Sequence, residues 1–184
     1  MPNWCNNSIT ISGPTETIKE LWESASSIVA EEGGLLEAMS PMPAALNDTV
    51  ADGSEGMNWY NWRVSNWGTK WDVGTEGLEF IDNGDGTACI TGWFDSAWAP
   101  PIEAYNTFLD DMDNCSLEAS YYEPGMDFGG FYRNGDDIYF EDLQAQLEQP
   151  TEEWSEAFTE FEQEYDLLSE EHRFEDEENL IEEG

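Results

Sequence analysis

Positive charge is scarce in this chain. Five Lys and Arg residues stand against 42 Asp and Glu, which gives a formal net charge of −37 over 184 residues. A surface this negative repels phosphate groups, so we expect no direct binding of nucleic acid or of an anionic membrane. Proteins with a basic surface are the partners that this charge favours.

Residues for catalysis and metal binding are also few. The single histidine, His172, lies beside the acidic C-terminus, which argues against a Ser-His-Asp or Cys-His site in the main domain. No His/Cys cluster offers zinc ligands, so we predict no metal and no cofactor. Asp95 and Glu123 could in principle act as an acid–base pair, but no spacing demands it. The sequence favours a protein that is not an enzyme.

Cysteine and long apolar runs are sparse as well. The three cysteines include no C-x-x-C pair and are predicted to be reduced thiols: Cys5, Cys89 and Cys115. No apolar run approaches 18 residues, and the opening MPNWCNNS lacks the basic and apolar regions of a signal peptide. We therefore expect a cytoplasmic protein with no membrane span.

The apolar residues that are present predict an α+β domain. A strand is expected at NSITISG, because Ile9 and Ile11 alternate with polar residues. A helix should follow, with Thr15 or Thr17 as its N-cap and apolar residues as far as Val29, and stop at Gly33-Gly34. Residues 35–69 form an irregular, Trp-rich excursion, in which MNWYNWRVSNWG can make a short helix.

The second half of the domain repeats the alternation of strands and helix. KWDVGTEGLEFI and TACITGWFDSAW are predicted to form a hairpin around the turn DNGDG, whose glycines suit a tight turn. A helix should begin at Pro100-Pro101. CSLEASYYEPG and MDFGGFYRNGDDIYF are each interpreted as one strand. Over residues 1–140, this order predicts a ferredoxin-like antiparallel sheet with two helices on one face.

Residues 141–184 form a separate acidic segment with 18 of the 42 acids. From Thr151, an apolar stripe at spacings of four and three predicts an amphipathic helix, followed after His172 by an acidic tail. The stripe can dock on its own domain, on a twin subunit or on a partner. The protein could accordingly be a monomer or a homodimer. The candidate partner-binding residues are Glu152, Glu153, Glu156, Glu160 and Glu164, with Trp154, Phe158 and Phe161.

Several ordered motifs resemble one known family. MPNWCNNSITISG, MSPMPAAL, NWRVSNWGTKWDV, WFDSAWAPP and ASYYEPGMDFGGFY are similar, in this order, to blocks of the YubB-like ferredoxin-like domain of small phage- and plasmid-encoded proteins. The resemblance covers about residues 1–140 and implies a ferredoxin-like sheet. Ser96 departs from the usual Thr of its block. No binding or catalytic residue is carried over by position.

Tryptophan is concentrated in the middle of the chain, where two interpretations remain open. A buried core would have Trp71, Trp93 and Trp98 under the excursion, on the sheet face opposite the helices, with Lys70 paired to Asp72 or Glu123. A ligand pocket, with or without enzymatic activity, would use the same rings around a few polar groups. The predicted cluster comprises Trp59, Trp62, Trp67, Lys70, Trp71, Asp72, Trp93, Trp98 and Glu123.

The negative charge supports two accounts of function. In the first, a phage or plasmid protein binds a host or element protein with a basic surface, and acts as an anti-defence or host-takeover inhibitor that imitates DNA. In the second, the charge is an adaptation to salt, and the chain is a structural or accessory phage protein. The first account is our leading hypothesis.

Overall fold

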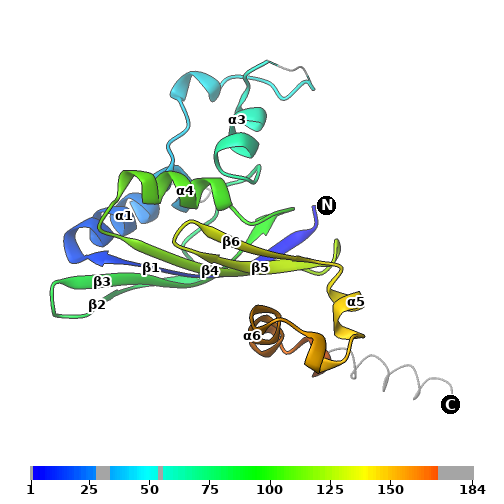
Figure 1. The fold of residues 1–184 in the computed structure, drawn as a ribbon. Helices are drawn as coiled ribbons and strands as arrows, with labels where there is room; N and C mark the ends of the chain where they lie inside the picture. Colours follow the sequence, from blue (N-terminus) through cyan, green and yellow to red (C-terminus); the bar gives the residue numbers. More distant parts are fainter. Residues whose placement is uncertain (1, 28–33, 54–55, 170–184) are drawn as a thin grey trace, which may run out of the picture.

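A computed structural model describes residues 2–27, 34–53 and 56–169 of the chain. The predicted α+β class is confirmed: a six-stranded antiparallel sheet has the order β2-β3-β1-β4-β5-β6 and is flanked by helices (Figure 1). The strands are β1 (Trp4–Pro14), β2 (Leu78–Asp82), β3 (Thr87–Ala97), β4 (Ser116–Glu123), β5 (Phe128–Arg133) and β6 (Asp136–Glu141).

Strand β1 lies inside the sheet, between β3 and β4, and its alternation separates the two faces. Ile9 and Ile11 are buried toward the helices of one face, whereas Ser8 and Thr10 are exposed on the other. Successive side chains of a strand point to opposite faces, so the alternation of apolar and polar residues determines which face carries the main core.

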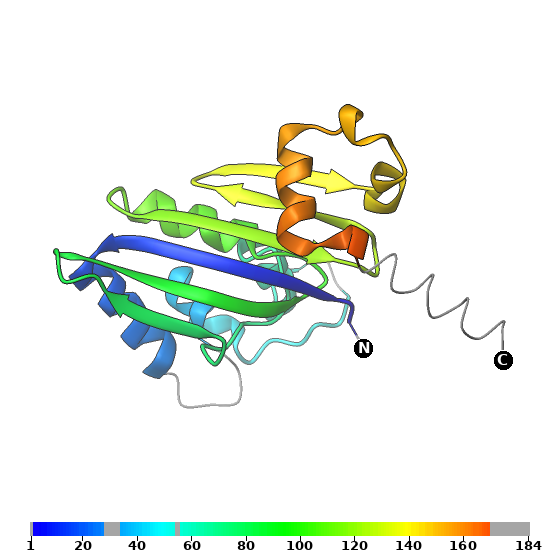
Figure 2. The same cartoon turned by 90° about the horizontal axis from the view of Figure 1, so that it is seen from below.

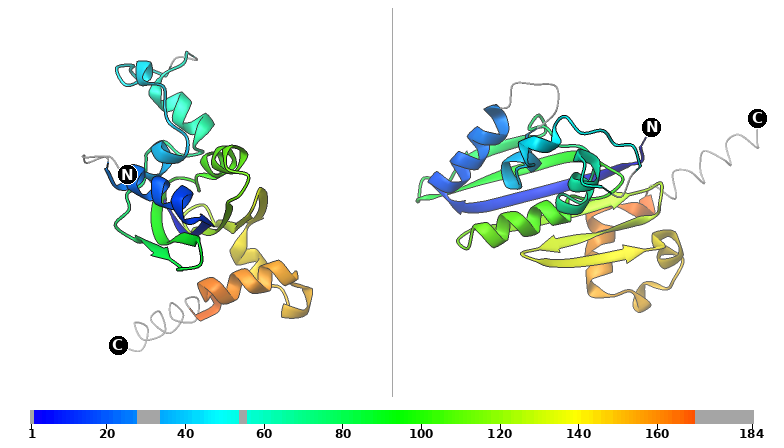
Figure 3. Two further views of the ribbon diagram at one scale, coloured as in Figure 1. Left: turned by 90° about the vertical axis from the view of Figure 1, so that its left-hand side faces the viewer. Right: turned by 90° about the horizontal axis from the view of Figure 1, so that it is seen from above.

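The main core lies between the sheet and the helices of its upper face (Figure 1). These helices are α1 (Thr15–Ser27), α2 (Leu35–Met39), α3 (Trp59–Asn66) and α4 (Ile102–Asp111). Both predicted helices, α1 and α4, lie on this face, as seen from above in Figure 3. The predicted end of the first helix, from residue 28 to Gly33, falls outside the described residues.

The excursion was predicted to cover the opposite face of the sheet, and this prediction was wrong. Leu35, Leu36, Met39 and Trp67 join the main core on the same face as α1 and α4. The outer part of the excursion, with α3, projects from the body on the side away from the C-terminal helix (Figure 3). These side chains pack beside the first helix because burying their apolar surface there is favourable.

The turns determine where the strands begin and end. The DNGDG turn connects β2 and β3 as predicted, with Gly84 and Gly86 at positive φ. Residues 70–77, predicted as part of the hairpin strand, are irregular instead. The predicted single strand over residues 126–140 is two strands, because Asn134-Gly135, both at positive φ, turns the chain from β5 into β6. Asn-Gly is a strong signal for such a hairpin.

The opposite face is covered in part by the C-terminal segment. This segment contains α5 (Leu143–Leu147), a 3-10 turn (Thr151–Glu153) and α6 (Glu156–Tyr165), which crosses the sheet from below (Figure 2). The predicted continuous helix from Thr151 is therefore interrupted. Ser155 caps α6 by accepting a hydrogen bond from the Phe158 backbone N–H at 3.0 Å.

The apolar stripe of α6 docks on its own sheet. Phe158 and Phe161 are buried in a second core with Phe131 of β5 and Leu143 of α5. The Phe161 ring lies 5.7 Å from the Phe131 ring, centroid to centroid, at a steep angle. The sequence left three possibilities for the stripe: its own domain, a twin subunit or a partner. In the structure its rings are buried against the same chain. The predicted acidic tail after His172 lies outside the described residues.

None of the helices in the described part of the chain combines the length and the apolar character that crossing a membrane requires.

Candidate functional site

The tryptophans predicted to form one cluster are divided among three places. Trp59, Trp62 and Trp67 lie on the helical side, where Trp67 is fully buried. Trp71 and Trp98 lie together elsewhere on the surface. Trp93 points out from β3 and is 60% exposed. The prediction of a single tryptophan cluster was therefore wrong.

The predicted burial of Trp71, Trp93 and Trp98 was also wrong. Trp71 is 39% exposed and Trp98 is 48% exposed. The reason is that the excursion packs on the helical face and leaves these rings without a cover. Only the core interpretation of Trp67 is confirmed by its burial.

Three exposed tryptophans and a lysine form one surface patch, which we call the Trp–Lys patch: Trp4, Lys70, Trp71 and Trp98. The rings of Trp4 and Trp71 have centroids 5.9 Å apart and are tilted by 41°. Lys70 Nζ lies 4.2 Å from the centroid of the Trp71 ring and 5.9 Å from that of Trp98. Both distances fall within the range of a cation–π interaction.

Trp98 is held in a conformation that bulky residues rarely adopt. Its φ is 72°, in the left-handed region. Its backbone N–H donates to the carbonyl of Asn3 at 2.9 Å, and the preceding carbonyl of Ala97 accepts a hydrogen bond from the buried hydroxyl of Thr69 at 2.8 Å. These hydrogen bonds fix the backbone beside the ring. Such strain persists where the surrounding structure over-determines it, and it is enriched at functional sites.

The loop that carries Lys70 is clamped against the segment after Trp98. Gly68 has a φ of +87°, and a Cβ atom there would lie 3.1 Å from the carbonyl oxygen of Pro100. Glycine suits both this conformation and this close approach, because it has no Cβ atom. Trp71 and Trp98 are 27 residues apart in sequence, and this backbone packing brings the segments that carry them together.

Asp72 anchors the other end of the loop. Its carboxylate accepts hydrogen bonds from the backbone N–H groups of Leu36 at 2.8 Å, Glu37 at 3.1 Å and Val73 at 2.8 Å. It thus caps the start of α2, and the predicted pairing of Lys70 with Asp72 was wrong. Burial raises the pKa of Asp72 to about 6, although the backbone hydrogen bonds oppose the shift.

Glu123 was predicted to approach the tryptophans and to offer Lys70 a partner, but its carboxylate is engaged elsewhere. Its buried carboxylate accepts hydrogen bonds from the backbone N–H groups of Gly125 at 2.8 Å and Met126 at 2.7 Å, in the turn after β4. Its role is to close its own turn. The alternative pairing of Lys70 with Glu123 was therefore wrong as well.

Arg63 is a second cation on tryptophan rings, and sequence reasoning missed it. Its guanidinium carbon lies 5.3 Å from the Trp59 ring and 4.8 Å from the Trp67 ring. The indole N–H of Trp67 donates to the carbonyl of Ser40 at 2.8 Å. This group packs at the base of the excursion, with Trp67 in the main core and with Arg63 and Trp59 partly buried.

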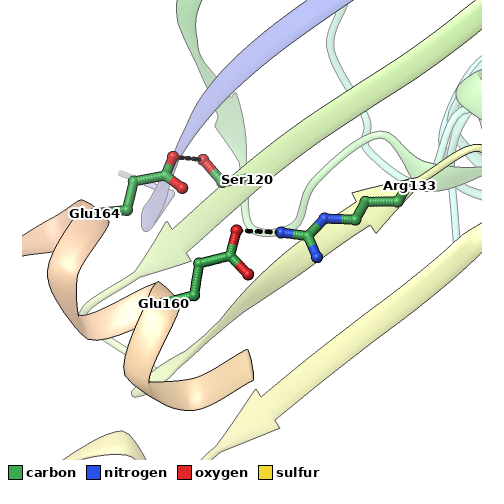
Figure 4. A network of polar contacts seen from close by, with 4 residues as sticks. All are labelled: Ser120, Arg133, Glu160 and Glu164. Atoms are coloured by element: carbon green, nitrogen blue, oxygen red, sulfur yellow. Dashed lines mark hydrogen bonds and ion pairs between the residues drawn. The ribbon is translucent and has the colours of Figure 1, made fainter. Parts of the chain in front are cut away.

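The acidic residues of the C-terminal segment divide into two sets. Glu152, Glu153 and Glu156 are exposed, as the prediction of a binding surface requires. Glu160 and Glu164 are exposed as well, but their carboxylates point toward the sheet (Figure 4). They contact polar groups of β4 and β5 that lie beside this edge of α6.

Polar contacts connect α6 to the sheet, and Figure 4 draws two of them. Arg133 Nη2 lies 2.5 Å from Glu160 Oε1, and the hydroxyl of Ser120 donates to the carboxylate of Glu164. The Tyr165 hydroxyl lies 3.1 Å from the Ser120 hydroxyl. Ser120, Arg133, Glu160 and Glu164 border a polar hollow of about 200 Å³ between α6 and strands β1, β4 and β5. The contacts orient α6 on the sheet.

The remaining predicted groups were cysteines. Cys5, Cys89 and Cys115 are free thiols in the structure. Burial, with the charge of Glu123 second, raises the pKa of Cys5 to about 12, so its reactive thiolate form is disfavoured. Among the described residues, no group of three His, Cys, Asp or Glu side chains is arranged to hold a metal ion.

The sequence contained a signal for one member of the Trp–Lys patch that the prediction overlooked. Trp4 is separated from Ser8 and Thr10 by an even number of residues along β1, so the three side chains point to the same face, away from the main core. By contrast, nothing in the local sequence indicated that the chain after β3 would approach the loop at Lys70.

Comparisons with known proteins give little further information. No family model and no curated protein matches the chain. A crystal structure of a protein called api92 from Yersinia pseudotuberculosis, of the family DUF1281, is similar at 18% sequence identity with a TM-score of 0.42. The match covers 59% of this chain and 40% of that one, so this chain spans less than half of that protein's length.

Proposed function

We propose that this chain is a non-enzymatic binding protein of a phage or plasmid, which acts in the host cytoplasm on a host or element protein with a basic surface. The single observation that carries this proposal is the Trp–Lys patch. Trp4, Trp71 and Trp98 expose 48%, 39% and 48% of their surfaces, in a chain with a net charge of −37. Inhibition of a nucleic-acid-binding host factor, through imitation of DNA charge, is the proposed consequence.

The composition of the Trp–Lys patch supports protein binding. Tryptophan is enriched among the residues that dominate binding energy at protein interfaces, and rings that are already fixed lose little conformational entropy on binding. The strained backbone at Trp98 and the clamped loop at Lys70 provide this rigidity. The energy spent on holding these exposed rings in place argues for a role beyond packing.

The acidic surface would add speed and selectivity to such an interface. Opposite charges accelerate encounter between partners, and the effect weakens as salt rises. The exposed acids of the C-terminal segment, among them Glu152, Glu153 and Glu156, extend this negative surface. We therefore propose that the tryptophans anchor the partner, whereas the carboxylates steer it.

The test is affinity capture from a host lysate at low salt, followed by elution with a salt step. The double variant W71A/W98A should lose the captured protein. Tyr139, at the far edge strand β6 and 53% exposed, supplies a matched control in Y139A, which should retain it. Equal capture by wild type and W71A/W98A would refute the assignment to the Trp–Lys patch.

A second comparison addresses the salt-adaptation alternative. The net charges of proteins encoded beside this one should be close to neutral if its acidity serves a specific interaction. Equally acidic neighbours would indicate that the charge reflects the solvent of the cell, and the DNA-mimic part of the proposal would fail.

A further inference from the structure

Lys70 occupies an unusual position for a cation in this chain. In a protein with 42 acids, its ammonium group lies on tryptophan rings, 4.2 Å from the centroid of Trp71. The salt bridges of the described residues join Lys19 to Glu23 and Arg133 to Glu160, and neither includes Lys70. Ring faces rather than a carboxylate therefore hold this cation.

The fold repeats this arrangement in a closed form. Arg63 lies against the rings of Trp59 and Trp67, and Trp67 is fully buried. The rings around Lys70 differ in that they are open to solvent. Both pairs of rings therefore hold a cation of this chain, but only the rings around Lys70 are exposed enough to accept a group from outside.

We propose that the Trp–Lys patch binds a cationic side chain, an arginine or a lysine, of a basic protein partner, and that Lys70 occupies this place in the free protein. The inference rests on the proposed function and specifies the chemistry of its interface. A lysine has a flexible four-carbon stem and can withdraw, whereas the planar guanidinium of arginine stacks well on indole.

Charge complementarity determines the choice of occupant. An anionic group would have to approach a protein with a net charge of −37. An apolar group would remove water from the Lys70 ammonium group and offer no polar contact in return. Asp95 is exposed on the strand face that carries Trp4. It lies opposite Asn6 in the β1–β3 register, and the Asn6 side-chain amide donates a hydrogen bond to its carboxylate at 3.4 Å. Its carboxylate can face an incoming guanidinium near the rings.

The test uses a fluorescent octa-arginine peptide, with an octa-citrulline peptide of similar size and no charge as the blank. Binding to the full chain is followed by fluorescence anisotropy at low salt. K70M removes the ammonium and keeps most of the stem. K19M makes the same change in net charge at Lys19, which is exposed on α1 and paired with Glu23, so it reports the general effect of charge.

We expect K70M to bind octa-arginine about two- to fivefold more tightly than K19M does, since an exposed cation–π contact of the usual strength corresponds to this ratio. Adding W71A and W98A to K70M should abolish the gain. Urea unfolding of each variant confirms that it is folded. Equal affinities of K70M and K19M, weaker binding by K70M, or a gain that survives without the tryptophans would each overturn the inference.

The outcome is separable from that of the proposed function. If W71A/W98A loses the lysate partner while K70M does not bind octa-arginine more tightly than K19M, the Trp–Lys patch binds a protein but not through a cationic side chain. If neither the partner nor the peptide depends on the tryptophans, both proposals fail.

Discussion

The contrast between Trp67 and Trp71 yields the sharpest prediction. Trp67 is fully buried in the main core, and its indole N–H donates to the carbonyl of Ser40 at 2.8 Å. W67A therefore removes a large ring, leaves a cavity and strands a carbonyl group. Truncation of a buried tryptophan costs about 3–5 kcal/mol, and an unsatisfied buried acceptor adds about 1–3 kcal/mol.

W71A should cost much less. The Trp71 ring is 39% exposed, so its removal leaves a site open to water and the cavity contribution is absent. The substitution removes the packing of the ring against Trp4, its cation–π interaction with Lys70 and its partial burial. We expect a decrease in the free energy of unfolding of about 1–2 kcal/mol, below half of the cost of W67A.

Equilibrium unfolding in urea, followed by far-UV circular dichroism, measures both values. Urea is preferred to guanidinium chloride because the salt would screen the repulsion among 42 acids. W67F separates the two contributions, since it keeps a ring and loses only the N–H donor and some volume. A W67A protein as stable as W71A would refute the assignment of Trp67 to the core and of Trp71 to the surface.

Three further predictions concern other parts of the molecule. Deleting residues 150–184 should lower the melting temperature at every protein concentration and increase dye binding, because the surface around Phe131 loses its cover; an unchanged melting temperature would contradict self-docking. Native thiol titration should modify Cys89 and Cys115 before Cys5, which is buried and should react only on unfolding; simultaneous reaction would contradict this order. The last prediction compares wild type with D72N: the pKa of Asp72 is raised from 3.8 to about 6, so the folded state favours its protonated form. Relative to D72N, wild type should lose about 2–3 kcal/mol of unfolding free energy as pH rises from 4 to 7. A difference in unfolding free energy between wild type and D72N that does not change with pH would contradict the raised pKa of Asp72.

The local sequence determined much of the fold. Alternation at Ile9 and Ile11 set the buried face of β1, and the glycines of DNGDG set the turn between β2 and β3. The stripe containing Phe158 and Phe161 predicted a helix that must bury one side. These features succeed because periodicity and turn conformation are properties of neighbouring residues.

Other features depended on which distant segments meet. Nothing local to Trp71 or Trp98 indicates that the excursion packs on the helical face and leaves both rings exposed. The same holds for Asp72, two of whose hydrogen-bond partners lie about 36 residues earlier, at the start of α2. A carboxylate or an indole can be satisfied in several ways, and the local sequence does not choose among them. The tertiary structure made that choice, because the packing of the core fixed which surfaces remained uncovered.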